Sequence, residues 1–362
     1  MNVNRRHLLT GTVGAAAVAL VASACASEDG DSGSGAGKKV GIAMPTKTSE
    51  RWILDGDNLK ASFEDQGYEV SLQYANDVAA DQVSQIETMV GQGVNVLVIA
   101  AIDNKSLNGV LAQAKEADVT VIAYDRLILD TPDVDYYTSF DNTKVGTLQG
   151  TYIAEKLGLT AGETGPFNIE LFAGALTDNN TKYFFGGAME VLQPYIDGGQ
   201  LVVLSGQTDL EQVATENWDG AVAQDRMETI LTSFYTGDTK VDAVLAPYDG
   251  ISRGIIAALD GAGYTTMPIV TGQDAEVDSV KYIIAGTQAM TVYKDTRELA
   301  DVTVDMVVAV LDGKDPEVND TETYDNGDHV VPAFLLEPVS VDATNYQAEL
   351  IDSGYIDEAD LG

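Results

Sequence analysis

A run of apolar and β-branched residues at positions 119–123 leads through one tyrosine into an acid and a base, Asp125 and Arg126. The run predicts a strand buried on both faces, which is typical of a parallel sheet. In open α/β sheets the ligand lies outside the carboxyl ends of the strands, so side chains directly after such a strand would face it. The alternative is a surface ion pair, which would contribute little. A second strand-like run, at 268–272, is also followed by an acid, Asp274, and this recurrence favours a site.

Strand-like runs of this kind recur in the first half of the chain. They lie at 40–44, 70–74, 94–99 and 119–123. Between them, apolar residues are spaced three or four positions apart, which predicts amphipathic helices. One such face comprises Ile53, Leu54, Leu59 and Phe63. Strands that alternate with helices predict parallel pairing and right-handed crossovers.

The same order of elements restarts in the second half. Its strand-like runs lie at 168–172, 201–204, 241–245 and 268–271, with helical patterns at 181–193, 218–235 and 250–262. The halves can be overlaid, because Asp103 corresponds to Asp249 and Asp125 corresponds to Asp274. We therefore predict an α/β fold of two similar Rossmann-like lobes, each built on a parallel sheet. Small-molecule sites concentrate in clefts of the kind that two such lobes would form.

Three connections between the lobes are expected, at 137–142, 291–295 and 330–335, and they would form a three-strand hinge. The predicted N-terminal lobe comprises residues 40–141 plus 290–332, and the C-terminal lobe comprises 142–289 plus 333–362. Residues 296–311 predict a long amphipathic helix. The acidic segment 312–328 lacks the ligand spacing of an EF-hand and is interpreted as a solvated loop.

The first residues have the pattern of a targeting signal. Arg5 and Arg6 precede a small-residue apolar stretch at 8–21, and Cys25, the only cysteine, occupies the acceptor position of a bacterial lipobox. Residues 1–24 are therefore predicted to be a lipoprotein signal peptide, exported by the general or the twin-arginine route. Residues 25–38 are predicted to be a flexible linker. The alternative is an ordinary secretory peptide with an incidental cysteine. We expect an extracytoplasmic protein that meets the membrane only through its lipid.

Composition excludes several functions. The chain has 57 Asp and Glu against 20 Lys and Arg, and its net charge of −37 argues against nucleic-acid partners and anionic membrane surfaces. After the signal it has one histidine, His329, no further cysteine, and neither a dinucleotide-binding glycine motif nor a Walker loop. We predict that it is not an enzyme and uses no cofactor and no metal. Glycoside hydrolysis by paired carboxylates stays open as an alternative.

Polar and aromatic residues cluster near the ends of the strand-like runs. They are Arg51, Trp52, Asp125, Arg126, Asp178, Asn180, Trp218, Asp249, Asp274 and Lys294. Carboxylates accept hydrogen bonds from sugar hydroxyls, Arg and Asn donate to them, and indoles cover apolar ring faces. Each residue alone has a structural alternative, since a Trp could lie in the core and Asp178 or Asp249 could cap a helix. Their shared location predicts a site for a neutral polyol such as a pyranose.

Several motifs resemble those of the xylose-binding and multiple-sugar-binding periplasmic receptors of the ChvE type. The motifs lie at 40–47, 51–52, 124–126, 140–142, 178–180, 272–275 and 293–294. The likeness extends from Lys39 to the C-terminus. One position departs from it, because Tyr248 precedes Asp249 where some relatives have Asn.

The resemblance implies a monomeric, two-lobed periplasmic binding protein of type I. Such a protein would deliver a monosaccharide, such as xylose, glucose, galactose or arabinose, to the permease of an ABC importer. It would in some cases also present its closed form to a membrane sensor. By resemblance, Trp52 and Trp218 would stack on the sugar, and the bonding residues would be Arg51, Asp125, Arg126, Asn180, Asp274 and Lys294. A repressor of the LacI type shares the lobes but needs an N-terminal DNA-reading helix pair and a basic surface. This chain has a lipobox in place of the helix pair and a strongly acidic composition in place of the basic surface.

Overall fold

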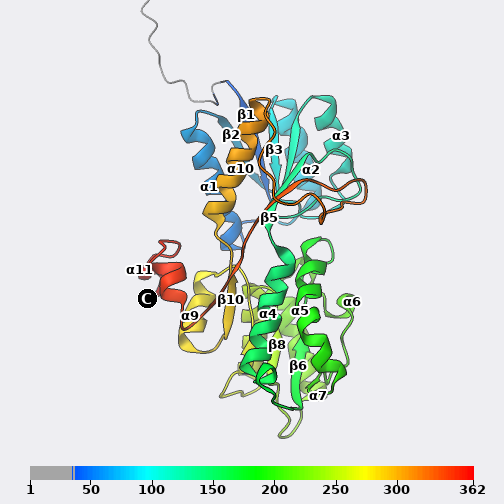
Figure 1. Cartoon of the computed structure of the whole chain (residues 1–362), viewed down its shortest axis with the longest axis vertical. Coiled ribbons are helices and arrows are strands. Elements are labelled where there is room, and N and C mark those ends of the chain that lie inside the picture. Colours follow the sequence, from blue (N-terminus) through cyan, green and yellow to red (C-terminus); the bar gives the residue numbers. More distant parts are fainter. Residues whose placement is uncertain (1–34, 36) are drawn as a thin grey trace, which may run out of the picture. The chain divides into compact units, whose positions relative to one another are not determined.

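The first lobe is built on a six-stranded sheet in the order β11-β5-β4-β3-β1-β2, in which every pairing is parallel (Figure 1). The computed structural model describes residue 35 and residues 37–362, and residues 33–362 form one compact unit. The strands are β1 (Lys39–Met44), β2 (Glu69–Tyr74), β3 (Val96–Ile99), β4 (Thr120–Tyr124), β5 (Tyr136–Phe140) and β11 (Ala333–Leu336). Cys25, the predicted signal peptide and most of the predicted linker lie outside the described residues.

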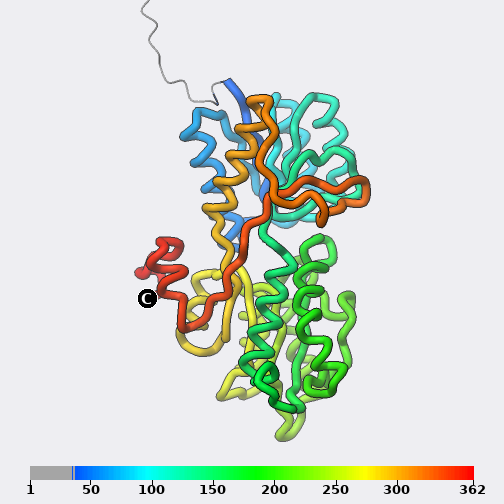
Figure 2. Tube along the Cα trace, in the orientation of Figure 1, coloured from blue at the N-terminus to red at the C-terminus, as the bar shows by residue number. Residues whose placement is uncertain are grey.

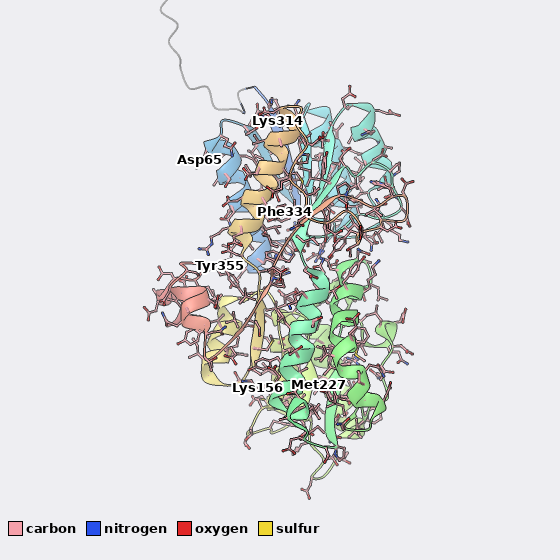
Figure 3. The ribbon with its side chains drawn as sticks, in the orientation of Figure 1. Asp65, Lys156, Met227, Lys314, Phe334 and Tyr355 are labelled. Atoms are coloured by element: carbon pink, nitrogen blue, oxygen red, sulfur yellow. The ribbon has the colours of Figure 1, made fainter. Side chains whose placement is uncertain are left out.

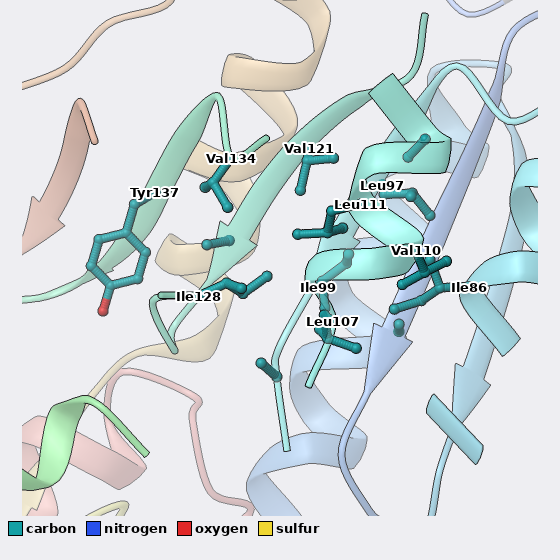
Figure 4. Close-up of a cluster of buried hydrophobic side chains, with 14 of the residues drawn as sticks. Ile86, Leu97, Ile99, Leu107, Val110, Leu111, Val121, Ile128, Val134 and Tyr137 are labelled. Atoms are coloured by element: carbon teal, nitrogen blue, oxygen red, sulfur yellow. The ribbon is translucent and has the colours of Figure 1, made fainter. Parts of the chain in front are cut away.

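Helices cover both faces of this sheet, which explains why its strands are apolar on both sides. They are α1 (Glu50–Asp65), α2 (Ala79–Gly91), α3 (Asn108–Glu116) and α10 (Thr296–Leu311). Alternate residues of β3 point to opposite faces. Leu97 packs in the core beneath α2 and α3 (Figure 4), whereas Val98 packs in the core beneath α1 and α10.

The second lobe has a four-stranded parallel sheet in the order β7-β6-β8-β9. Its strands are β6 (Phe167–Leu171), β7 (Leu201–Val202), β8 (Ala243–Leu245) and β9 (Ile269–Val270). One face is covered by α4 (Asn142–Lys156) and α5 (Asn180–Asp197), and the other by α7 (Gly220–Phe234) and α8 (Asp249–Gly261). Figure 3 shows Lys156 at the end of α4 and Met227 on α7 in this lobe, and Phe334 on β11 in the first. The two parallel-sheet lobes confirm the predicted fold class.

A smaller layer completes the second lobe. Strands β10 (Met290–Tyr293) and β12 (Val339–Asp342) pair antiparallel, and α9 (Val277–Ala285) packs beside them. The remaining short elements are α6 (Leu210–Val213), α11 (Glu358–Leu361), η1 (Leu159–Ala161), η2 (Glu216–Trp218) and η3 (Gln347–Ile351).

The chain passes between the lobes three times, after β5, between β10 and α10, and between β11 and β12 (Figure 2). Two segments differ from the predicted lobe boundaries. Residues 290–293 belong to the second lobe through pairing with β12, and residues 333–336 belong to the first through pairing with β5. The third crossing therefore starts at Glu337 and not at 330, and Pro338, which has no N–H to donate, ends the ladder there.

Within the described part of the chain, no helix has both the length and the apolar character needed to cross a bilayer. The same residues contain no cluster of three or more His, Cys, Asp or Glu side chains that could hold a metal ion.

Candidate functional site

A cavity of about 520 Å³ lies where the carboxyl ends of the first lobe's strands face the second lobe. Nine of the ten side chains predicted for the site line it: Arg51, Trp52, Asp125, Arg126, Asp178, Asn180, Trp218, Asp274 and Lys294. They come from both lobes and, in the case of Lys294, from the second crossing. The cavity therefore gathers residues that are far apart in the sequence.

Two aspartates take corresponding positions at the strand ends. Asp125 follows β4, and Asp274 follows β9 after a short connection. Both have left-handed backbones, with φ of 58° and 92°. The backbone N–H of Asp125 donates to the carbonyl of Thr138 at 2.7 Å, and that of Asp274 donates to the carbonyl of Val292 at 2.9 Å. Each acid is thus fixed to a neighbouring strand while its chain turns away, a conformation that Asp tolerates better than most residues.

A buried cluster of charges connects these two acids. The Arg51 guanidinium pairs with Asp125 through Nη2 at 2.5 Å and lies 3.5 Å from Asp274 through Nη1. Lys294 Nζ lies 3.0 Å from Asp274 and 3.9 Å from Asp125. All four side chains are at least nine-tenths buried. Burial opposes ionisation of Asp125, but the charges of Arg51 and Lys294 outweigh it and lower the pKa of this carboxyl, so it is an anion at neutral pH.

A second charged pair joins the lobes on another side of the cavity. Arg126 Nε lies 2.9 Å from an Asp178 carboxylate oxygen, but its N–H does not point at that oxygen, so the contact is an ion pair and not an aligned hydrogen bond. Arg126 Nη1 donates to the carbonyl of Ala101 at 3.1 Å. Asp178 accepts from the backbone N–H of Asn180 at 2.9 Å, and burial raises its pKa. Asn180 in turn donates through Nδ2 to the Asp125 carbonyl at 2.8 Å.

Trp52 supplies a flat apolar surface in the first lobe. The guanidinium groups of Arg51 and Arg126 both lie against its ring, and their central carbons are 4.8 and 5.0 Å from the ring centroid. Cation–π attraction therefore fixes both the ring and the two donors in place.

Trp218 supplies a second aromatic surface from the other lobe. It contacts Phe184 and Tyr248 edge to face, with centroids 6.2 Å apart in both cases. Its own backbone is left-handed, with φ of 58°. A Cβ on Gly174 would collide with the indole, so this glycine makes room for the ring.

Asp249, the tenth predicted residue, does not line the cavity. Asp249 is the first residue of α8, and its buried carboxylate accepts from Gln288 Nε2 at 2.8 Å, Thr291 Oγ1 at 3.1 Å and the backbone N–H of Glu276 at 3.0 Å. Burial and the charge of Glu276 raise its pKa well above the usual value. The structure therefore places Asp249 outside the cavity in which it was predicted to lie, where it supports the chain that follows Asp274.

Asp55, which sequence reasoning missed, holds Arg51 in position on the side away from the cavity lining. It accepts from Arg51 Nε at 2.9 Å and from the Tyr124 hydroxyl at 2.5 Å, and it is fully buried. Burial raises its pKa to about 6. The only sequence signal was the spacing of four residues between Arg51 and Asp55 on one helix, which places the two side chains together. The cavity lining also includes Phe184, Tyr248, Arg253 and Gln273, for which no role was predicted.

The arrangement combines hydrogen-bond acceptors, donors and aromatic faces around one space. Of the nine predicted residues that line it, three carboxylates can accept from hydroxyls, three cations and an amide can donate to hydroxyl oxygens, and two indoles can cover C–H faces. Opposite charges are paired, so the site suits a neutral ligand that exchanges hydrogen bonds with many polar groups.

Comparison with known proteins places the chain in a family. The family model described as "Periplasmic binding protein domain" matches residues 40–315. The chain is 60% identical over 324 residues to the "Multiple sugar-binding periplasmic protein SbpA" of Azospirillum brasilense, covering 88% of this chain and 90% of that protein. It is 54% identical over 320 residues to the "Multiple sugar-binding periplasmic receptor ChvE" of Rhizobium radiobacter, covering 87% and 90%.

A solved structure agrees with these relatives. An ABC transporter solute-binding protein from Clostridium phytofermentans, with bound β-D-glucose, is 51% identical and matches with a TM-score of 0.88, covering 90% of this chain and 100% of that one. These relatives are binding proteins, so the glycoside-hydrolysing alternative has no support. The chain belongs to the periplasmic binding proteins of type I, among the extracytoplasmic sugar-binding receptors of the ChvE and xylose-binding group, and it is not an enzyme.

Proposed function

We propose that this protein captures a monosaccharide in its pyranose form between the two lobes and delivers it to the permease of an ABC importer. The observation that carries the proposal is the convergence of nine polar and aromatic side chains from both lobes on one cavity. The relatives add support, because two are described as multiple sugar-binding and a third holds β-D-glucose. Glucose, xylose, galactose and arabinose are the candidate ligands.

The roles of the side chains follow from their chemistry. Asp125 and Asp274 accept hydrogen bonds from sugar hydroxyls, while Arg51, Arg126, Asn180 and Lys294 donate to them. The bonds to the charged side chains are charge-assisted and contribute about 1.5 to 3 kcal/mol each, whereas the bond to the neutral Asn180 amide contributes about 0.5 to 1.5 kcal/mol. Trp52 and Trp218 pack on the C–H faces of the ring.

Sugar binding would be coupled to lobe closure. Donors and acceptors come from both sides of the cavity, so a sugar that bridges them favours the closed form over the open one. Closure about the three crossings changes the surface that a permease, or a membrane sensor, would recognise. No covalent chemistry is required.

The proposed anchor is a lipid on Cys25, which would keep the receptor at the membrane. Support comes from the sequence, where the only cysteine follows a small-residue apolar stretch. Replacing it, Cys25→Ser, should move the protein from the membrane fraction to the soluble fraction when cells are fractionated. If the variant stays with the membrane, the lipid anchor is ruled out.

The test of function is calorimetric titration of residues 33–362, which form one compact unit. D-glucose, D-xylose, D-galactose and L-arabinose should be compared with D-glucitol, an open-chain polyol that offers hydroxyls but no ring. We expect a dissociation constant of micromolar or tighter for at least one pyranose, no binding of the open chain, and recovery of the sugar unchanged by mass spectrometry. Failure to bind any of the four sugars, or recovery of a chemically altered sugar, would refute the proposal.

A further inference from the structure

We propose that Glu276, with Ser49, Glu50 and Tyr248, forms a latch that holds the two lobes together through direct contacts and thereby sets how long a bound sugar is retained. The latch rests on the proposed function, because its effect is exerted on the same cavity. It adds a determinant of affinity that makes no use of the sugar's own hydroxyls.

Two hydrogen bonds cross between the lobes beside the cavity. The Ser49 hydroxyl donates to Glu276 Oε1 at 3.0 Å, and the backbone N–H of Val277 donates to Glu50 Oε2 at 3.1 Å. Ser49 and Glu50 begin α1 in the first lobe, whereas Glu276 and Val277 begin α9 in the second.

The contact satisfies a backbone N–H that α9 leaves open at its start. Ser49 and Glu276 are the N-cap residues of α1 and α9, and neither side chain caps its own helix. The first N–H groups of a helix have no partner within the helix. Glu50 supplies an acceptor to one of them from the opposite lobe, with a charge of the sign that a helix N-terminus favours.

Glu276 is held in position by its own lobe. The Tyr248 hydroxyl donates to its Oε1 at 2.6 Å, and Arg253 Nη2 donates to its Oε2 at 2.5 Å. The side chain is 4% exposed. Because these bonds lie within one lobe, they do not depend on the approach of Ser49. An acceptor that is already ordered loses little conformational entropy when the lobes meet, which makes the crossing bond more favourable.

Tyr248 links the latch to the cavity. It lines the cavity, and its ring stands at 89° to the ring of Trp218, which is proposed to stack on the sugar. Its hydroxyl donates to Glu276 at the same time. Tyr248 therefore joins the proposed sugar face to the latch.

Energetically, a latch acts on the equilibrium between open and closed forms. Apparent affinity falls in proportion to the fraction of protein in the binding-competent form. Ser49 and Tyr248 line the cavity, whereas Glu276 and Glu50 do not, so Glu50→Ala is the variant that breaks a crossing bond without altering the cavity wall. Weakening the latch should therefore reduce affinity for every sugar by the same factor, mainly through faster dissociation, whereas loss of a sugar contact should change the order of preference among sugars.

The experiment compares variants that break the crossing bonds but leave the Glu276 network intact. Ser49→Ala should raise the dissociation constants for D-glucose and D-xylose by the same factor, about two- to tenfold, which is the range expected for one hydrogen bond. In stopped-flow measurements, Ser49→Ala should release the sugar faster than the parent, while the association rate changes less. Glu50→Ala should act in the same direction but less, because Glu50 is exposed. Ser49→Thr keeps the hydroxyl and should retain the parent's affinity. Glu64→Ala, at the exposed far end of α1, is the matched control.

Scattering in the absence of sugar gives an independent readout. The latch predicts that Ser49→Ala has a larger radius of gyration than the parent, because the open form gains population. Unchanged affinity, dissociation rate and scattering in Ser49→Ala would overturn the latch, and so would a loss confined to one sugar. If the parent binds no sugar, the proposed function fails, and scattering alone then decides the latch. Circular dichroism of each variant verifies folding.

Discussion

At the scale of single residues, the cavity is lined by charged side chains that hold one another in position. Arg51 is within ion-pair distance of Asp55, Asp125 and Asp274. A buried charge is tolerated only where it is paired and hydrogen-bonded. Removing one member should therefore have two effects, since the sugar contact proposed for it is lost and an opposite charge stays buried without its partner.

Asp125→Ala should weaken sugar binding by roughly tenfold to a thousandfold, at 1.4 kcal/mol per decade of affinity. The variant loses a directional acceptor and leaves Arg51 and Lys294 short of a partner, so the ranking of glucose, galactose and xylose should change. Trp218→Ala is the contrast, because loss of a stacking face should weaken binding to these pyranoses alike. Calorimetric titrations of both variants provide the test. If Asp125→Ala folds and binds every sugar like the parent, Asp125 is not a ligand.

The raised pKa of Asp55 predicts that the stability of the protein depends on pH. Burial raises its pKa from 3.8 to about 6. Between these values the folded protein holds a proton that the unfolded chain has released, so rising pH favours unfolding. Relative to Asp55→Asn, the parent should lose roughly 3 kcal/mol of unfolding free energy as pH rises from about 3.5 to about 7, at about 1.4 kcal/mol per pKa unit. Urea unfolding across this range is the measurement. Asp57→Asn, exposed on the same helix, should follow the parent, and a flat difference for Asp55→Asn would contradict the assignment.

At the scale of elements, the close packing of α4 on α5 positions part of the site. Asn180 is the first residue of α5, so the location of this helix decides where its amide lies. A Cβ on Gly187 would collide with the carbonyl of Thr143 on α4, and one on Gly146 would collide with that of Phe184 on α5. Glycines at these two contacts let the helix backbones approach each other.

Gly187→Ala should therefore destabilise the protein by about 1 to 3 kcal/mol, the usual cost of overpacking. Gly186→Ala is its matched control, because a Cβ there meets no atom within 4 Å. As alanine is the better helix former, the control should be neutral or more stable by up to about 1 kcal/mol. Thermal unfolding of the two variants compares them directly, and equal midpoints would show that the helix contact can relax.

Elements could be predicted from the sequence where burial selects a run of apolar residues, and they were missed where the buried residues are polar. The β-branched run before Tyr124 is buried on both faces, so it could be identified as a strand. Strand β5 was assigned to a crossing because it includes Thr138 and Ser139, which are polar yet fully buried. Strands β10 and β11 lie next to crossings, where nothing in the sequence indicates which lobe provides the pairing partner.

The same distinction explains the site. Side chains that follow strands line one cavity as expected, since parallel strands bring their carboxyl ends to one edge. Asp249 was misplaced because the sequence does not determine whether the first carboxylate of a helix faces solvent, ligand or a neighbouring loop. The contacts of Asp55 and Glu276 depend on the tertiary approach of Tyr124 and Ser49, which is not encoded in local spacing.

At the scale of the whole molecule, the dominant property is charge. The chain carries a net charge of −37 at neutral pH. Like charges at this density repel one another in the compact state more than in the expanded chain. The fold therefore depends on the ions around it.

Raising potassium chloride from about 0.1 to about 1 M should increase the thermal midpoint, because the screening length falls from about 10 to about 3 Å. The same addition near pH 4, close to the sequence pI of about 4.1, should have a smaller effect because little net charge remains to be screened. Calorimetric scans at the two pH values are the measurement. An equal salt effect at both would show that charge repulsion is not the cause.

The placement of the aromatic residues has a practical consequence. The chain has only two tryptophans, and both Trp52 and Trp218 line the cavity. Indole emission, excited selectively over the 16 tyrosines, therefore originates only at the site. Trp52 contacts two guanidinium groups and Trp218 contacts two aromatic rings, so their spectra should respond differently to the same event. The protein thus contains its own optical reporter of occupancy, and replacing either indole leaves a reporter for a single lobe.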